Sequence, residues 1–324
     1  MYAVFGEGRL TTGERLDIGV VDAPDPDWAA RLIAFLRHKP PDWDYQIRSS
    51  LTGPLDGLSS RYYVGTVGGE VVTCVMVIGA RGFGSLSHVF TAPAWRRRGA
   101  YRQLMERQMA DVRRLGYRAL TLWTGYDSHA YWIYHSFGFR SVAEGSGSMR
   151  WLADPTVQLT VSGPAAVRPT LWDDWPAYGY ATLEPVGADE PLPRSPLMNV
   201  KGQRSVEGAF VTFQRRVLSH PGADSRMLVA EDGAVVGWCH VAPGPIVFAD
   251  GWQLDLHVRP GFESELGPLV EGVTWPDGPV IFVADTWREE YLACLRGAGF
   301  AEAAALPGFV ARPEGRRPLG LWVR

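Results

Sequence analysis

The 324-residue chain is poor in lysine, in cysteine and in long apolar runs. Only two of its 32 basic residues, Lys39 and Lys201, are lysines, a bias that codon usage explains and that carries no functional information by itself. Three cysteines without a Cys-x-x-Cys pair exclude a disulfide framework and a zinc site of ordinary spacing, and we expect no metal. A net charge of -3 excludes a broad basic face for nucleic acid.

The sequence also shows no pattern typical of a membrane-spanning or secretory segment. The longest apolar stretch, residues 71–80, is interrupted by Thr73 and is far shorter than the roughly 18 residues of a spanning helix. It predicts a strand instead. The first ten residues lack the basic and apolar regions of a secretory signal. We therefore expect a cytoplasmic protein with no membrane and no nucleic-acid partner.

The length predicts about two domains, and the charge divides unevenly between them. Residues 1–150 hold 18 basic and 14 acidic residues, whereas the rest hold 14 and 21. Proline-containing sequence with little helical periodicity separates the two parts at residues 151–169. We predict one domain over residues 1–154 and another over 155–324.

The two halves also repeat the same features in the same order. Each has a strand, a glycine-containing turn and a strand, at residues 62–77 and again at 227–242. Each continues with a strand that ends before proline, at Pro93 and Pro260, and later reaches Gly-Phe. The matched features are 161 to 167 residues apart, which favours an internal duplication of one α/β unit.

One strand, turn and helix in the first half are suited to binding an anion. A β-rich run at residues 84–90 leads into Arg-Arg-Arg-Gly, and apolar residues from Tyr101 to Leu115 then follow a helical period until Gly116. The first N–H groups of a helix have no partner within it and lie at the positive end of its dipole. Gly99 allows close approach of the backbone. Positive charge is added there by Arg96, Arg97, Arg98 and Arg102.

A second motif follows this helix. Residues 119–123 predict a strand, Asp127 is a candidate N-cap, and residues 130–136 predict a short helix that ends at Phe137-Gly138-Phe139. The run from Gly84 to Val142 resembles the GNAT acetyltransferase superfamily. Its signature Arg/Gln-x-x-Gly-x-Gly/Ala is matched by Arg96 and Gly99, with Tyr101 at the usually small last position, and its Tyr-x-x-x-Gly-Phe is matched from Tyr134.

The resemblance implies the fold and a cofactor. The fold would be two tandem GNAT-like domains, each a mixed, mostly antiparallel twisted sheet flanked by helices. The cofactor would be acetyl-CoA, or another acyl-CoA, and the activity N-acetylation of a small-molecule amine that attacks the thioester directly in a ternary complex. The cofactor contacts implied in this way are the backbone of Val89, Phe90 and Thr91, the turn Arg96, Arg97, Arg98, Gly99, Ala100, Tyr101 and Arg102, and Ser128 and Tyr131.

The same resemblance implies that Tyr134 donates a proton to the departing thiolate. The amine, with a pKa near ~10, must lose a proton before attack, and His88 is the only ionisable side chain in the preceding strand. Strand alternation places residues 86, 88 and 90 on one face unless a bulge intervenes. A buried core histidine, with proton loss through ordered water, is the alternative to His88 as the base.

Aromatic residues beside carboxylates suit a cationic amine. The segment Trp43, Asp44 and Tyr45 is therefore a candidate acceptor surface, because this family usually selects its acceptor with the first helices. The alternative is an ordinary helix start with core aromatics.

The second half does not keep the anion-binding turn. Residues 261–268 contain no Arg-x-x-Gly pattern, and Glu263 and Glu265 would repel a pyrophosphate. We expect a degenerate GNAT-like domain that does not bind CoA, in which His240, Asp255 and His257 are strand-face residues. A CoA-binding sensor or partner protein without catalysis remains the alternative for the whole chain.

Overall fold

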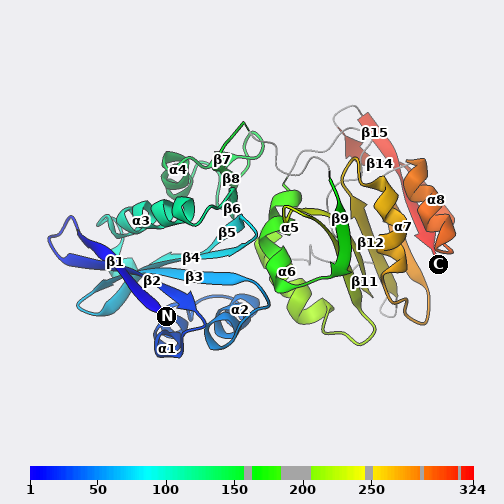
Figure 1. The fold of residues 1–324 in the computed structure, drawn as a ribbon. Helices are drawn as coiled ribbons and strands as arrows, with labels where there is room; N and C mark the ends of the chain where they lie inside the picture. The colour runs from blue at the N-terminus through cyan, green and yellow to red at the C-terminus, as the bar shows by residue number, and fades with distance from the viewer. Residues whose placement is uncertain (157–162, 184–205, 245–250, 285–287, 313–314) are drawn as a thin grey trace. The chain divides into compact units, whose positions relative to one another are not determined.

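The computed structural model describes residues 1–156, 163–183, 206–244, 251–284, 288–312 and 315–324. The chain divides into two compact units. The first consists of Met1–Val157 with Leu171–Tyr180, and the second of Gln158–Thr170 with Ala181–Arg324. Each unit is built around its own sheet (Figure 1).

The first unit contains an 8-stranded sheet with the order β1-β2-β3-β4-β5-β6-β8-β7. All neighbouring strands in it are antiparallel except β5 and β6, which are parallel. The strands are β1 (Tyr2–Arg9), β2 (Arg15–Ala23), β3 (Ser59–Val67), β4 (Glu70–Ala80), β5 (Phe83–Thr91), β6 (Ala119–Trp123), β7 (Arg140–Ser141) and β8 (Ser148–Leu152). Gly68 and Gly69, both with positive φ, form the predicted turn between β3 and β4.

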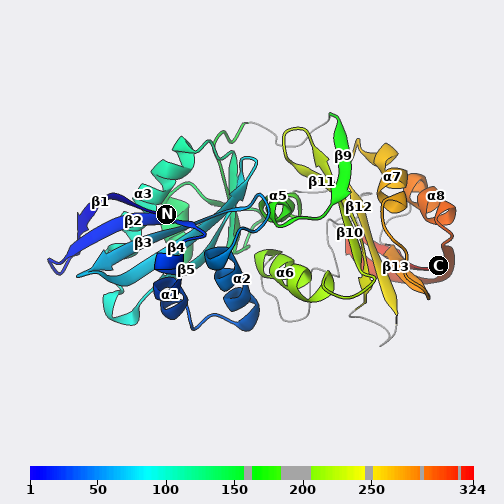
Figure 2. The same cartoon turned by 60° about the horizontal axis from the view of Figure 1, so that its bottom comes forward.

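Helices cover both faces of this sheet (Figures 1 and 2). The helices α1 (Pro26–Phe35) and α2 (Pro41–Thr52) lie on one face, and α3 (Ala100–Arg114) and α4 (His129–Ser136) lie on the other. The apolar side of α3 is buried against the sheet as its periodicity predicts, through Leu104, Met105, Met109 and Val112. The helix ends where Gly116 adopts a φ of 74°.

A bulge interrupts the ladder between β4 and β5. Cys74 pairs with Phe90 and Met76 pairs with Ser87, so His88 and Val89 together lie opposite Val75. His88 has a φ of 54°, which is unusual for a residue other than glycine. Two residues opposing one bend the strand and leave part of its backbone outside the ladder. The bulge anticipated as an exception to strand alternation is therefore present.

The second unit contains a 7-stranded sheet with the order β14-β15-β13-β12-β11-β10-β9. Read from β9, this is the order of the first sheet from β2 onward, and it contains one parallel pair, β12 with β13. The strands are β9 (Ala165–Pro169), β10 (Asp224–Ala230), β11 (Val235–Pro243), β12 (Trp252–Val258), β13 (Val280–Ala284), β14 (Ala301–Arg312) and β15 (Gly315–Val323).

The helices of the second half are short, and the register of its central strands is regular. The pairing of β11 with β12 runs from Gly237 to Pro243 without a bulge. On one face α7 packs against β10 and β11, and α8 follows β13 (Figure 1). The described helical segments of the second half are η2 (Trp172–Asp174), α5 (Trp175–Ala181), α6 (Val206–Thr212), η3 (Phe213–Val217), η4 (Glu263–Glu265), α7 (Leu266–Glu271) and α8 (Glu289–Gly297). The first half has one further short segment, η1 (Pro93–Trp95), between β5 and α3. None of the described helices is long and apolar enough to cross a membrane.

Candidate active site

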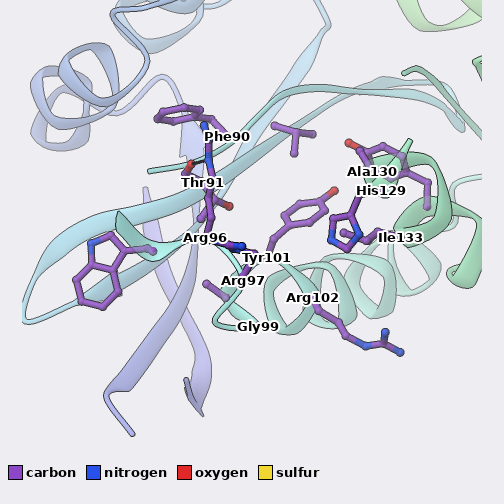
Figure 3. Close-up of a pocket in the computed structure, with 14 residues that line it drawn as sticks. Phe90, Thr91, Arg96, Arg97, Gly99, Tyr101, Arg102, His129, Ala130 and Ile133 are labelled. Carbon is purple, nitrogen blue, oxygen red and sulfur yellow. Dashed lines mark hydrogen bonds between the residues drawn. The ribbon is translucent and has the colours of Figure 1, made fainter. Parts of the chain in front are cut away.

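A cavity of about 640 Å³ opens on the α3/α4 face of the first sheet. Figure 3 shows that its walls come from the end of β5, from the turn before α3 and from α4. It is lined by Val89, Phe90, Thr91, Trp95, Arg96, Arg97, Gly99, Ala100, Tyr101, Arg102, His129, Ala130, Ile133 and Tyr134. The cavity therefore brings together the predicted anion-binding turn, the end of the strand and the predicted proton donor.

The turn before α3 has the backbone shape that the sequence predicts for an anion site. Gly99 is the N-cap of α3 and has a φ of 82°, a left-handed conformation that favours glycine. No acidic residue lies in the first turn of the helix. The unpaired N–H groups of this turn and the positive end of the helix dipole are suited to an anionic group.

The four arginines of the turn do not act alike. Arg97 and Arg102 are exposed residues that line the cavity, and Arg102 Nε also lies 3.7 Å from Glu106 Oε1 on the next turn of α3. Arg96 donates from Nε to the carbonyl oxygen of Thr91 at 3.0 Å, which ties the turn to β5. Arg98 is held elsewhere, because its Nη1 lies 3.0 Å from Glu14 Oε1. Arg98, which the sequence predicts as a cofactor contact, does not line the cavity.

Tyr134 and Tyr101 both line the cavity. Their ring centroids are 6.2 Å apart in an edge-to-face arrangement. Burial raises the pKa of Tyr134 to about 12, and a hydrogen bond with Tyr101 partly offsets that rise. The Tyr101 hydroxyl also lies 2.9 Å from Met105 Sδ. The large residue at the last signature position is thus a neighbour of the predicted proton donor.

His88 lies away from this cavity, on the side of the sheet that α2 covers. His88 is buried, and its Nε2 lies 2.7 Å from Gln46 Oε1. Its ring packs edge-to-face with the Trp43 ring, with 4.8 Å between the ring centroids. Burial, with smaller contributions from Lys39 and His38, lowers its pKa well below 6.5. The structure therefore does not bring His88 and Tyr134 into one cavity.

The start of α4 differs from the prediction. Ser128, not Asp127, is the N-cap, because its Oγ accepts a hydrogen bond from the Tyr131 N–H at 3.1 Å. Asp127 has a φ of 58° and accepts instead from Trp132 Nε1 at 2.8 Å. The N-cap prediction for Asp127 was wrong because tertiary geometry turns its backbone away from the cap conformation.

Two further residues predicted to contact the cofactor have hydrogen-bond partners within the protein. Ser128 is occupied as the cap of α4, and the Tyr131 hydroxyl lies 3.0 Å from Ser141 Oγ. Neither residue lines the cavity.

The predicted acceptor surface at the start of α2 is not assembled as one face. Trp43 packs against His88, whereas Tyr45 is 40% exposed. Asp44 Oδ2 accepts from Arg48 Nε at 2.7 Å, one helical turn away. The carboxylate that was expected to attract a cationic amine is therefore already paired.

Four residues that line the cavity were not predicted from the sequence: Trp95, His129, Ala130 and Ile133. Ala130, Ile133 and Tyr134 share one side of a helix by their spacing, and that spacing could have identified the first two. Trp95 and His129 carry no such signal, because only the folded turn and helix N-terminus bring them to the cavity.

Comparison with known proteins identifies the first unit. Residues 59–141 match the family model described as the acetyltransferase (GNAT) domain. The first half of the chain therefore contains a GNAT domain, whose matched segment runs from β3 to β7 and includes the cavity turn. The two sheets are consistent with a tandem form of this fold. No curated protein matches the chain.

Solved GNAT structures resemble about half of the chain. The ribosomal-protein-S18-alanine N-acetyltransferase from Escherichia coli is 14% identical, with 49% of this chain and 92% of that chain covered and a TM-score of 0.31. A GNAT-family acetyltransferase from Staphylococcus aureus Mu50 is 14% identical, with 42% and 99% covered and a TM-score of 0.35. The GNAT domain of S. lividans PAT is 18% identical, with 45% and 96% covered and a TM-score of 0.34.

Proposed function

We propose that the chain is an N-acetyltransferase that transfers the acetyl group of acetyl-CoA to a small-molecule amine in a ternary complex. The observation that carries this proposal is the single cavity that joins the α3 turn, the bulged end of β5 and Tyr134. An anionic cofactor with an extended arm and a reactive end requires these three features in this order.

The cavity suits CoA at both of its ends. The N–H groups at the start of α3, with Arg97 and Arg102, supply donors and positive charge for the pyrophosphate. Val89, Phe90 and Thr91 form the wall along which the pantetheine arm would lie, and the bulge frees part of their strand from the β4 ladder. When bound, the cofactor supplies an activated thioester that an amine can attack.

Tyr134 holds a proton where the proposed reaction needs one. A tyrosine with a pKa of about 12 stays protonated at neutral and mildly alkaline pH. Its hydroxyl can then protonate the thiolate that leaves when the C–S bond breaks and the new C–N bond forms. Tyr101, hydrogen-bonded to Tyr134, lowers the cost of removing that proton.

We propose that the acceptor amine loses its proton through ordered water and not to His88, because His88 is buried on the α2 side of the sheet and does not line the cavity. Since Gln46 Oε1 only accepts hydrogen bonds, neutral His88 carries its proton on Nε2 and keeps a lone pair on Nδ1. Burial holds the ring in this neutral form at pH 7, because its pKa is well below 6.5. The same burial opposes the imidazolium form, so His88 is a poor acceptor for a proton from an amine.

The test compares Tyr134→Phe with Tyr117→Phe, a buried tyrosine that does not line the cavity. Release of CoA thiol and acetylated product would be followed across a panel of amines. We expect Tyr134→Phe to lower kcat about 100-fold while CoA affinity, measured by calorimetry, stays unchanged. Tyr117→Phe should keep kcat.

Three results would decide against the proposal or refine it. Tight acetyl-CoA binding without turnover of any amine would favour a CoA sensor or partner protein. Turnover with a longer acyl-CoA in preference to acetyl-CoA would change the acyl group but keep the mechanism. No affinity for CoA would overturn the proposal.

A further inference from the structure

The strand that lines the cavity also faces α2, on the opposite side of the sheet. β5 and β6 pair only from Phe83 to Ser85, and beyond that point β5 continues to Thr91 with no partner strand on the β6 side among the described residues. Val89 lines the cavity, whereas the adjacent His88 contacts α2. An acyl group held beside Val89 is therefore open to approach from the α2 side.

The loop between α1 and α2 lies over this part of β5. The ring centroids of His38 and Phe90 are 4.0 Å apart, and those of Trp43 and His88 are 4.8 Å apart. Lys39 stands between these two anchored residues in the chain, and its N–H donates to the Leu36 carbonyl oxygen at 3.0 Å. The loop thus brings one of the two lysines of the chain to the bulge.

Lys39 is a half-buried cation without a carboxylate partner in the described part of the chain. The nearest candidate by sequence, Asp44, is bonded to Arg48. In addition to burial, Lys39 acts to lower the pKa of the neighbouring His88. Burial also lowers the pKa of Lys39 itself. An anionic group beside Lys39 would pair with its half-buried ammonium group.

We propose, on the basis of the proposed function, that the acceptor is an amine that also carries a carboxylate, as an amino acid does, and that Lys39 pairs with that carboxylate. The pairing would hold the amino group of the acceptor beside the bulge, since the carboxylate and the amine of an amino acid are separated by a single carbon. The acceptor is thus a zwitterion recognised through its anionic end, and not a simple cation recognised by Asp44.

The experiment uses pairs of acceptors that differ only in this carboxylate. Each amino acid of a panel is compared with the amine that remains when its α-carboxyl group is removed, and kcat/KM is measured with acetyl-CoA. We expect the full-length wild-type protein to favour the amino acid at least ~10-fold. A charged hydrogen bond of this kind contributes about 10- to 100-fold in affinity.

Variants of the loop assign the preference to Lys39. Lys39→Met should lower kcat/KM for amino acids about 10- to 100-fold, mainly through KM, and leave that for the decarboxylated amines unchanged. Lys39→Arg, which keeps the charge, should retain part of the preference. Arg37→Met removes an exposed cation two residues away and is the control. It should leave kcat/KM unchanged both for the amino acids and for the decarboxylated amines.

The outcomes separate this inference from the proposed function. Preference for the decarboxylated amines, or an equal loss for both acceptors in Lys39→Met, would overturn the role of Lys39 and leave the acetyltransferase proposal standing. Absence of turnover with both members of every pair would overturn the proposed function and this inference with it.

Discussion

The two central strand pairs of the chain have the same topology and different local geometry. In the first unit, two residues of β5 lie opposite one residue of β4, and the strand bends away from its partner. In the second unit, β11 and β12 pair without interruption from Gly237 to Pro243. A regular ladder uses the backbone groups on the side of the strand that faces its partner, whereas a bulge leaves some of them outside the ladder.

The turns that follow β5 and β12 differ in the charge they place near the backbone N–H groups. In the first unit, Gly99 leads into a 15-residue helix without acidic residues in its first turn. In the second, Glu263 accepts from the Gly261 N–H at 2.8 Å and pairs with Arg288 at 2.7 Å. The carboxylate of Glu263 thus occupies an N–H donor that an external anion would need. The two units thus share a strand order but not the turn that follows the central strand.

The buried histidines of the second unit have structural neighbours. His240 and His257 of the second sheet are buried, and desolvation lowers the pKa of each to about 3. His240 Nδ1 lies 2.6 Å from Ser225 Oγ, and the His257 ring stacks on Trp238 at 4.5 Å. These contacts are structural, as expected for strand-face residues in a unit without a comparable turn.

The largest expected effect comes from giving the first turn the charge of the second. Arg97→Glu combined with Arg102→Glu would place carboxylates where a pyrophosphate is proposed to bind. Losing two charged contacts of this kind costs about 3 kcal/mol, so the Kd for CoA should rise about 100-fold in calorimetry. Arg107→Glu, on the exposed side of the same helix, is the control. Equal affinity in the double variant would mean that the turn does not hold the cofactor.

A smaller effect concerns acid stability of the second unit. A histidine whose pKa is lowered to about 3 on folding is neutral in both the folded and the unfolded state above pH ~6.5. As the pH falls from ~6.5 toward 3, the unfolded state binds a proton that the folded state does not, so the free energy of unfolding decreases. At pH 5 the loss is about 2 kcal/mol per histidine. In urea unfolding of the full chain, His257→Phe should reduce the loss between pH 7 and pH 5 by about this amount.

The control for this prediction is His220→Phe, because His220 is exposed. It should leave the difference between the two pH values unchanged. A His257→Phe variant with the acid sensitivity of the wild-type protein would show that His257 is not held neutral by burial.

The smallest effect compares the Gly-Phe motif of the two units. Gly138 and Gly299 both have positive φ, so alanine costs about 1 kcal/mol at each position. A Cβ at Gly138 would lie 3.2 Å from the buried Trp151, whereas at Gly299 it would meet the side chain of Arg324 at 3.7 Å. Gly138→Ala should therefore cost about 1 kcal/mol more in urea unfolding. Equal losses would indicate that Trp151 moves freely.

The sequence by itself determined the local elements of this protein. Apolar periodicity predicted α3, glycine placed the turns at Gly69, Gly99 and Gly116, and the repeated features predicted that one α/β unit occurs twice. Such features depend on neighbouring residues along the chain, so a pattern of a few positions is sufficient.

Only the tertiary structure decided which side chains are free to act. Glu14 removes Arg98 from the cavity, Arg48 neutralises Asp44, and the bulge sends His88 toward α2. Lys39, which the composition made unremarkable, is left without a partner in the described residues. The physical reason is that the charge and reach of a side chain depend on its neighbours in space, and long-range contacts set those neighbours after the local elements have formed.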